Sequence, residues 1–305
     1  MRKTKQMASK FLLVIFMGLI AAPLYAQLPA HLRDFPLVQR QQEGDFVAPF
    51  FDGWTPNEDG SVTMTFGFMN RNLSEVVDVP LGPNNFIEPP MFDGAQPTHF
   101  PVYKRPGFIG TRERGAFAVT VPAEMAGTEV VWTINHAGHK YSVPGRATSI
   151  AYEMSRAERA LGSLSPAIRF SDNGPETTDR EGVMADKITA SIGSPVTLSA
   201  YVQDRGNRDD YDEVESKHFP LGIEWILHQG PSVPEFESPM VTGRQRVRDG
   251  EAGAENWTLE STKATFWEPG EYVIRVRVDN FAAPDSKFDN HCCWSNAYIP
   301  VTVTP

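Results

Sequence analysis

The sequence is poor in cysteine, in positive charge and in long apolar runs, and each shortage narrows what the protein can be. Its two cysteines are adjacent, so neither has another partner within the chain. Lysine and arginine total 28 against 38 acidic residues, and no basic window is present that could bind nucleic acid. The apolar runs of a multi-span membrane protein are missing, and the helical period of 3.6 residues appears only once and briefly.

What the 305 residues do contain is a turn-rich mixture. Glycine and proline number 24 and 25, and hydrophobic residues make up 41% of the chain. This composition excludes a coiled coil, a collagen-like chain and a wholly disordered chain. The length suits a targeting segment followed by two domains of roughly 120 residues each.

Residues 1–26 have the pattern of a secretory signal peptide. Four basic residues precede the apolar run 11–22, and Ala26 stands at the expected cleavage site. An uncleaved anchor is the alternative, because Leu24 is larger than the residue usually found three positions before a cut. Cleavage removes four of the 28 basic residues and none of the 38 acidic ones, which leaves a net charge of −14 and no transmembrane segment. We therefore expect a periplasmic or secreted protein that repels polyanions.

Apolar and polar residues alternate along the rest of the chain, which is typical of half-buried β-strands. The alternating segments are 62–68, 117–121, 130–134, 196–202, 223–227, 272–279 and 297–303. Turn-forming residues stand between them, as at positions 56–60. The predicted fold class is all-β, with two immunoglobulin-like β-sandwich domains in tandem after a cleaved signal peptide.

Proline, glycine, serine and mixed charge interrupt this pattern between about residues 144 and 186. We assign residues 27–148 to an N-terminal sandwich domain and residues 187–305 to a C-terminal one. Residues 149–186 are interpreted as a linker, with a short helix near residues 152–161.

Three segments of the second half, 225–231, 263–278 and 297–304, resemble PKD-like and REJ-like immunoglobulin-fold modules of bacterial surface proteins. The resemblance implies a spacer or binding unit rather than an enzyme. In physical terms, we expect Trp225 between the sheets, a turn at Pro269 and Gly270, and Tyr272 in a tyrosine corner. The loop 204–219 is longer and more acidic than such modules lead us to expect.

The first half is similar to a family of uncharacterised secreted bacterial proteins. The similar segments are 51–54, 66–72, 82–85 and 96–100. This resemblance implies a β-rich exported domain and brings no activity with it.

Cys292 and Cys293 have three interpretations. Consecutive α-carbons lie about 3.8 Å apart, below the about 4.4–6.8 Å of ordinary disulfides, so a bond between them would be strained. An oxidising compartment nevertheless favours this vicinal disulfide. The alternatives are two free thiols pointing in opposite directions along a strand, and a soft-metal site completed by His291.

His136 and His139 are metal candidates because they flank the two residues Ala137 and Gly138 at a predicted hairpin tip. If these two residues form the whole turn, the histidines are cross-strand neighbours with β-carbons about 5 Å apart. Two ligands are fewer than the three protein ligands of a catalytic zinc, so a solvated tip is the simpler interpretation.

An acidic stretch concentrates oxygen atoms of the kind that bind calcium, which makes calcium the one candidate cofactor. Its candidate ligands are Asp204, Asp209, Asp210 and Asp212. The spacing is not that of an EF-hand, and Arg205 and Arg208 would compete for the carboxylates. A solvated acidic loop, with no cofactor at all, is the alternative.

Seven aromatic residues of the first half lie in segments that read as proline-rich loops. They are Phe50, Phe51, Trp54, Phe92, Phe100, Tyr103 and Phe108. Loop aromatics can form a platform for a sugar or a protein partner, but more often they pack beneath the loops.

Short motifs of nucleophilic or metal-dependent hydrolysis are missing, including Gly-x-Ser-x-Gly, Ser-x-x-Lys and His-Glu-x-x-His. We therefore expect a non-catalytic exported protein, a binding or structural module whose partner is an unidentified protein or glycan. One alternative is a secreted hydrolase or metal-handling protein with a site around His99, His136 and His139. Another is an accessory subunit of an exported enzyme complex.

Overall fold

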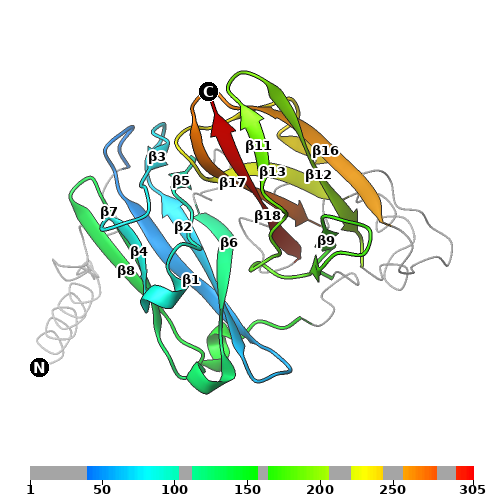
Figure 1. The fold of residues 1–305 in the computed structure, drawn as a ribbon. Coiled ribbons are helices and arrows are strands. Elements are labelled where there is room, and N and C mark those ends of the chain that lie inside the picture. The colour runs from blue at the N-terminus through cyan, green and yellow to red at the C-terminus, as the bar shows by residue number, and fades with distance from the viewer. Residues whose placement is uncertain (1–39, 103–111, 157–163, 206–220, 243–256, 280–292) are drawn as a thin grey trace, which may run out of the picture. The chain divides into compact units, whose positions relative to one another are not determined.

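The computed structural model describes residues 40–102, 112–156, 164–205, 221–242, 257–279 and 293–305, and these form an all-β protein (Figure 1). Besides strands, the described residues contain three one-turn 3-10 segments at Pro90–Phe92, Ala123–Met125 and Ile150–Tyr152. The all-β class expected from the alternation is therefore confirmed. No helix of this described part is long and apolar enough to cross a membrane.

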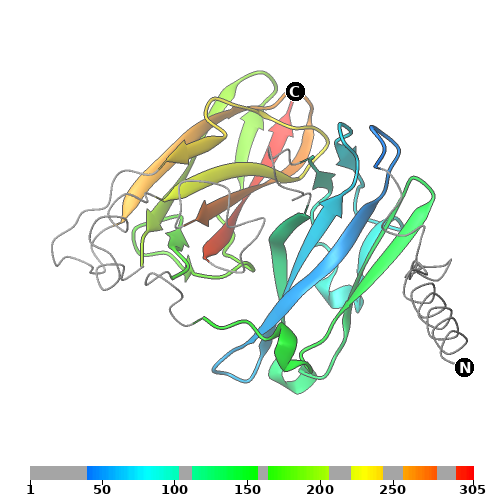
Figure 2. The ribbon, with the colours of Figure 1, turned by 180° about the vertical axis from the view of Figure 1, so that it is seen from behind.

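The first half forms two small antiparallel sheets and one short strand pair. One sheet contains β1 (Val47–Pro56), β2 (Val62–Asn70) and β6 (Arg112–Val121). The other contains β4 (Asn85–Glu88), β7 (Val130–His136) and β8 (His139–Gly145), and the short pair is β3 (Val77–Asp78) with β5 (His99–Phe100). Figure 2 shows the long blue hairpin of β1 and β2 next to the green hairpin of β7 and β8.

Large aromatic side chains fill the core of this N-terminal sandwich. Phe66 stacks on Phe117 with ring centroids 5.4 Å apart, and Trp132 meets Phe117 edge-on at 5.0 Å. Phe68 and Phe100 form a further edge-on pair at 5.0 Å. Each of these five side chains is at most 1% exposed. Because an aromatic ring buries a large area, a few of them can stabilise a sandwich of small sheets.

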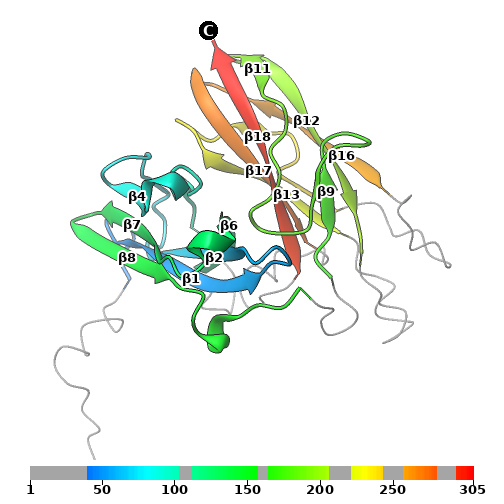
Figure 3. The same ribbon diagram turned by 60° about the horizontal axis from the view of Figure 1, so that its bottom comes forward.

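The second half forms a larger sandwich of two five-stranded sheets, whose layers separate in Figure 3. In spatial order, the first sheet contains β10 (Glu176–Thr177), β9 (Ala167–Arg169), β12 (Pro195–Gln203), β16 (Thr258–Thr265) and β14 (Glu235–Phe236). The second contains β11 (Ile188–Ser191), β18 (Trp294–Thr304), β17 (Gly270–Asp279), β13 (Gly222–Gln229) and β15 (Met240–Thr242).

The strand order of the second half is that of an immunoglobulin sandwich. β12 and β16 are neighbours in one sheet, whereas β13, β17 and β18 are neighbours in the other. Strands B and E, and strands C, F and G, occupy these places in immunoglobulin domains. The chain order and the pairing therefore identify the C-terminal half as immunoglobulin-like.

The expected core residues of this C-terminal sandwich lie where the sequence placed them. Trp225 is 2% exposed and belongs to the aliphatic core between the sheets. Tyr272 is also buried, and its hydroxyl donates to the carbonyl oxygen of Glu268 at 2.9 Å. This backward hydrogen bond to the preceding turn is the defining contact of a tyrosine corner.

Residues 164–186, which the sequence assigned to a linker, contain β9 and β10 of the C-terminal sandwich. Before them, Ile150–Tyr152 forms a 3-10 turn, and residues 157–163 of the expected helix lie outside the described residues. Both sandwiches belong to one compact unit, Gln41–Pro305. The domain boundaries, the independence of the two domains and the signal peptide remain predictions.

Candidate functional site

Charged side chains of β17 are buried on the face that points away from their own core. Tyr272, Ile274 and the following even-numbered residues face the C-terminal core. The alternate residues Arg275, Arg277 and Asp279 are only 2%, 1% and 4% exposed. Such burial requires partners, since an unpaired buried charge is strongly unfavourable. Both arginines donate to β6 of the N-terminal sandwich, and Arg277 also pairs with Asp279 in its own strand.

Arg275 is the central residue of this junction. Its guanidinium donates to the carboxylate of Glu113 and to the carbonyl oxygen of Ala116, both in β6. Glu113 is only 1% exposed, so the ion pair is removed from water on both sides. Losing one partner of such a pair typically costs about 3–5 kcal/mol, because the other charge stays buried and uncompensated.

Trp294 of β18 makes a second contact with β6. The guanidinium groups of Arg180 and Arg277 lie over its ring, at 4.6 and 4.3 Å from the centroid, which is within cation–π range. On the other side of the junction Gly115 adopts a φ of 55°, and a β-carbon there would lie 2.6 Å from Cζ2 of Trp294. Only glycine therefore allows both the backbone turn and the approach of the tryptophan.

Amide and carboxylate groups satisfy the backbone around Gly115. The Asn296 side chain donates to the carbonyl oxygens of Gly115 and Arg180, at 3.0 and 3.1 Å. The Gly115 N–H donates to a carboxylate oxygen of Asp52 at 2.8 Å, and Asp52 also pairs with Arg112. The backbone N–H and carbonyl oxygen of Gly115 are thus both hydrogen-bonded, by side chains from the two sandwiches.

A second part of the junction lies at the end of β13. The Thr98 N–H donates to the carbonyl oxygen of His228 at 2.8 Å, and Nε2 of His228 lies 2.9 Å from the carbonyl oxygen of Ala95. The Gln229 side chain donates to the carbonyl oxygens of Gly94 and Gln96 at 2.8 and 2.7 Å. Burial, reinforced by the nearby charge of Arg275, lowers the pKa of His228 to about 3. His228 is therefore neutral in the folded protein at neutral pH.

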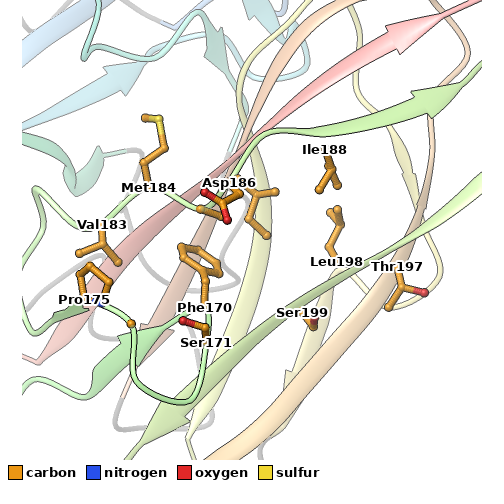
Figure 4. Close-up of a pocket in the computed structure, with 13 residues that line it drawn as sticks. Phe170, Ser171, Pro175, Val183, Met184, Asp186, Ile188, Thr197, Leu198 and Ser199 are labelled. Carbon is orange, nitrogen blue, oxygen red and sulfur yellow. The ribbon is translucent and has the colours of Figure 1, made fainter.

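A cavity of about 460 Å³ opens at the side of the C-terminal sandwich (Figure 4). Its apolar lining includes Leu198 of β12 and Ile188 of β11, which point toward one another, together with Phe170 and Val183. The volume lies within the range of about 300–1,000 Å³ that is usual for ligand sites. This cavity therefore has room for another molecule.

A separate acidic hollow of about 500 Å³ is lined by residues of the β1–β2 turn, by residues 176–179 and by Glu181. Arg156 pairs with Asp179 there, and Glu181 accepts from the backbone N–H of Thr120 at 3.0 Å. Burial raises the pKa of Glu181. Asp179 and Glu181 are thus engaged with protein partners, and the described residues contain no group of three metal-ligating side chains.

The two hairpin histidines do become neighbours. Ala137 and Gly138 form the whole turn, with φ values of 51° and 77°, and His136 stands opposite His139 in the strand pairing. His139 is exposed and stacks on Tyr141 with centroids 6.0 Å apart. His99 instead pairs with Asp78, at 2.7 Å between Nδ1 and a carboxylate oxygen. No described metal-ligand group unites His99, His136 and His139.

The other candidate ligands are only partly within the described residues. Asp204 is half-buried at the end of β12, whereas Asp209, Asp210 and Asp212 lie outside the described residues. Cys293 is fully buried just before β18, and no described cysteine is free. Its neighbour Cys292 lies outside the described residues, so the vicinal disulfide stays a prediction, as does calcium binding.

Four of the five described aromatic residues of this set belong to the N-terminal core or pack against it. Phe50, Phe51 and Trp54 belong to β1, not to a loop, and Phe100 of β5 is fully buried. Phe51, Trp54 and Phe92 pack against the N-terminal core. Tyr103 and Phe108 lie outside the described residues. The packing interpretation therefore holds for Phe51, Trp54, Phe92 and Phe100, whereas the half-buried Phe50 lies against the guanidinium of Arg112.

Sequence reasoning missed the junction itself. A signal for it was present, because β17 carries two arginines and an aspartate at alternate positions of a strand that lies between β13 and β18. One sequence cannot tell whether such a polar face meets water or another sandwich. The residues that receive it, Glu113, Gly115 and Ala116, have no recognisable motif.

No protein-family profile and no curated protein matches the chain. Among solved structures it is similar to the D00-D0 domain of intimin, with 10% identity, a TM-score of 0.25, and coverage of 84% of this chain and 100% of that one. It is also similar to domains 4 and 5 of the S-layer protein SbsC, with 10% identity, a TM-score of 0.23, and coverage of 86% and 98%. The assignment of the fold rests on the strand order of this chain.

Proposed function

We propose that the protein is an exported, non-catalytic module that holds two β-sandwiches as one rigid body for binding or structural support. The observation that carries this proposal is the buried pair of Arg275 and Glu113 between the sandwiches. Contacts between domains of one chain are by default loose enough to allow relative motion. A buried ion pair with surrounding hydrogen bonds opposes such motion.

The chemistry of the junction supports this role. Its polar atoms point at backbone carbonyls and at oppositely charged side chains, as Asn296 and Arg275 do. These groups are used to hold protein against protein. The periplasm or the extracellular space is the proposed location, because the N-terminal segment has the pattern of an export signal.

The test combines cell fractionation with capture of partners. We expect the processed chain in the envelope or secreted fraction, and we expect tagged protein to retain a specific protein or glycan after chemical cross-linking there. The matched variant is Arg275→Met, which loosens the junction. Capture that depends on the junction would support a rigid module, whereas a cytoplasmic, unprocessed chain would contradict the proposal.

A secreted hydrolase or metal-handling protein is the second candidate function. The observation in its favour is the contact of the buried His99 with the carboxylate of Asp78, which orients the imidazole as a base would need. Metal analysis of the purified mature protein separates the two proposals. A stoichiometric metal that is lost in His99→Gln would favour this second function.

A further inference from the structure

The cavity of Figure 4 adjoins an open stretch of sheet edge. β16 pairs with β12 from Pro195 to Val202, but on the opposite side β9 pairs only with the last three residues, Tyr201 to Gln203. β11 belongs to the other sheet, where it runs parallel to β18. Within the described chain, residues 196–200 therefore have a strand on one side only.

An open edge in the middle of a strand exposes backbone N–H and C=O groups that can pair with another chain. Here the edge borders apolar core side chains as well. Leu198 and Ile299 are core residues, and they line the cavity together with the half-buried Phe170 and Ile188. Met184, at the rim, is 65% exposed. Methionine adapts to side chains of different shape, which suits a binding rim.

The charge at the rim of the cavity indicates which charge the bound molecule carries. Among the described residues, Asp186 is the one charged side chain that lines the cavity, and it is exposed. The neighbouring lysine, Lys187, reaches Glu271 instead, at 2.9 Å. A basic group of an incoming molecule would therefore find a carboxylate next to the apolar space.

We propose that this cavity and edge bind an extended peptide segment of a partner protein. The segment adds as an antiparallel strand along residues 196–200, where β9 ceases to pair, and places alternate apolar side chains in the cavity. A basic residue of the segment pairs with Asp186. Strand addition explains both features together, because the backbone supplies affinity and the pocket selects every second side chain. This inference rests on the proposed binding function and gives it a partner chemistry.

The test selects displayed random dodecapeptides on the full mature chain and measures the affinity of the selected peptides. Ala185→Phe fills the cavity from its wall, and Asp186→Asn removes the rim charge. Asp172→Asn is the matched control, because Asp172 is an exposed aspartate of the same segment that does not line the cavity. Hydrogen exchange of the β12 amides, with and without peptide, reports the binding mode.

We expect peptides with alternating apolar residues and a lysine or arginine. Binding should weaken at least tenfold in Ala185→Phe and severalfold in Asp186→Asn, with no change in Asp172→Asn, and the amides of residues 196–200 should exchange at least tenfold more slowly in the complex. If Ala185→Phe does not fold, the comparison of Asp186→Asn with Asp172→Asn and the hydrogen-exchange data are sufficient to test the inference. No enrichment of alternating peptides, or binding without protection of these amides, would overturn the inference. A partner captured from the envelope in that case would leave the proposed function standing.

Discussion

The two sandwiches reach stability by different means. The N-terminal sandwich has three-stranded sheets and a core of stacked aromatic rings, whereas the C-terminal one has five-stranded sheets and a mainly aliphatic core. β17 and β18 pair over ten residues, but β3 and β5 pair over only two. A pairing as short as that of β3 with β5 supplies few ladder hydrogen bonds, so other groups hold the loops around it.

Buried side-chain amides perform that task. Asn85 is fully buried and donates to the carbonyl oxygens of Val79 and Pro97, at 2.9 and 2.8 Å. It also accepts from Nε1 of Trp132 at 2.9 Å. Asn70 similarly donates to the carbonyl oxygens of Glu75 and Phe100, both at 2.9 Å. Individual polar contacts therefore hold the loops of the N-terminal sandwich, in addition to the register of its longer strands.

Loosening the junction between the two sandwiches should cause the largest loss of stability. Arg275→Met should destabilise the protein by about 3–5 kcal/mol, because Glu113 would remain buried without its cation. Urea unfolding followed by tryptophan fluorescence should then resolve two transitions. The double variant Arg275→Met with Glu113→Leu should lose less than the single variant. Equal or additive losses would mean that the pair is not coupled as the structure places it.

Removing one buried tryptophan from each core compares the two packings directly. Trp132→Ala and Trp225→Ala should each cost about 3–5 kcal/mol, with Trp132→Ala at the upper end. Trp132 contacts Phe66, Phe100 and Phe117, and it also donates to Asn85. Calorimetry of the two variants measures the difference. A larger loss of stability in Trp225→Ala would contradict the expectation that the aromatic cluster around Trp132 stabilises its core more strongly.

The polar contacts of the N-terminal sandwich can be tested with one amide. Asn85→Ala should cost about 1–3 kcal/mol, because two carbonyl oxygens and an indole N–H lose their buried partner. Asn135→Ala is the matched control, since the side-chain amide of Asn135 donates an exposed hydrogen bond to the side chain of Asn84. The control should stay within about 0.5 kcal/mol of the wild type in chemical unfolding. Similar losses in both variants would remove the distinction between buried and exposed amides.

Acid should weaken the junction through His228. Its pKa in the folded protein is about 3, below the ordinary value of 6.5, so the unfolded chain binds more protons between these two values. Stability contributed by the neutral ring is complete above about pH 6.5 and is lost as the pH falls toward 3, by at most about 1.4 kcal/mol per pH unit. His228→Gln should show a shallower pH dependence in urea unfolding. An unchanged slope would show that the ring is accessible to protons.

The smallest expected effect concerns the tyrosine corner. Tyr272→Phe removes the hydrogen bond to Glu268 and should cost about 1 kcal/mol. Tyr201→Phe serves as the control, because Tyr201 is half-buried and lies outside the C-terminal core. Thermal unfolding of both variants is sufficient. Equal shifts would mean that the corner adds nothing beyond the burial of the ring.

The local pattern of the chain was sufficient for several of the longer strands. Alternation at residues 62–68 and 272–279 predicted β2 and β17, and a turn separates β1 from β2 where residues 56–60 predicted one. The burial of Trp225 and the corner at Tyr272 were expected from the segments that resemble immunoglobulin-fold modules. β1 escaped recognition, because Phe50 and Phe51 are adjacent apolar residues and a bulge interrupts the strand after Phe51.

By itself the sequence determined the all-β class and the identity of the core-facing residues, because strand alternation depends on neighbouring residues in the chain. It could not determine what covers the opposite face of β17. Arg275 and Arg277 would be ordinary in a solvated strand, and only their contact with β6 makes them buried. The open edge beside Leu198 likewise depends on where β9 stops pairing. Such features join segments far apart in the chain, so only the tertiary structure decided them.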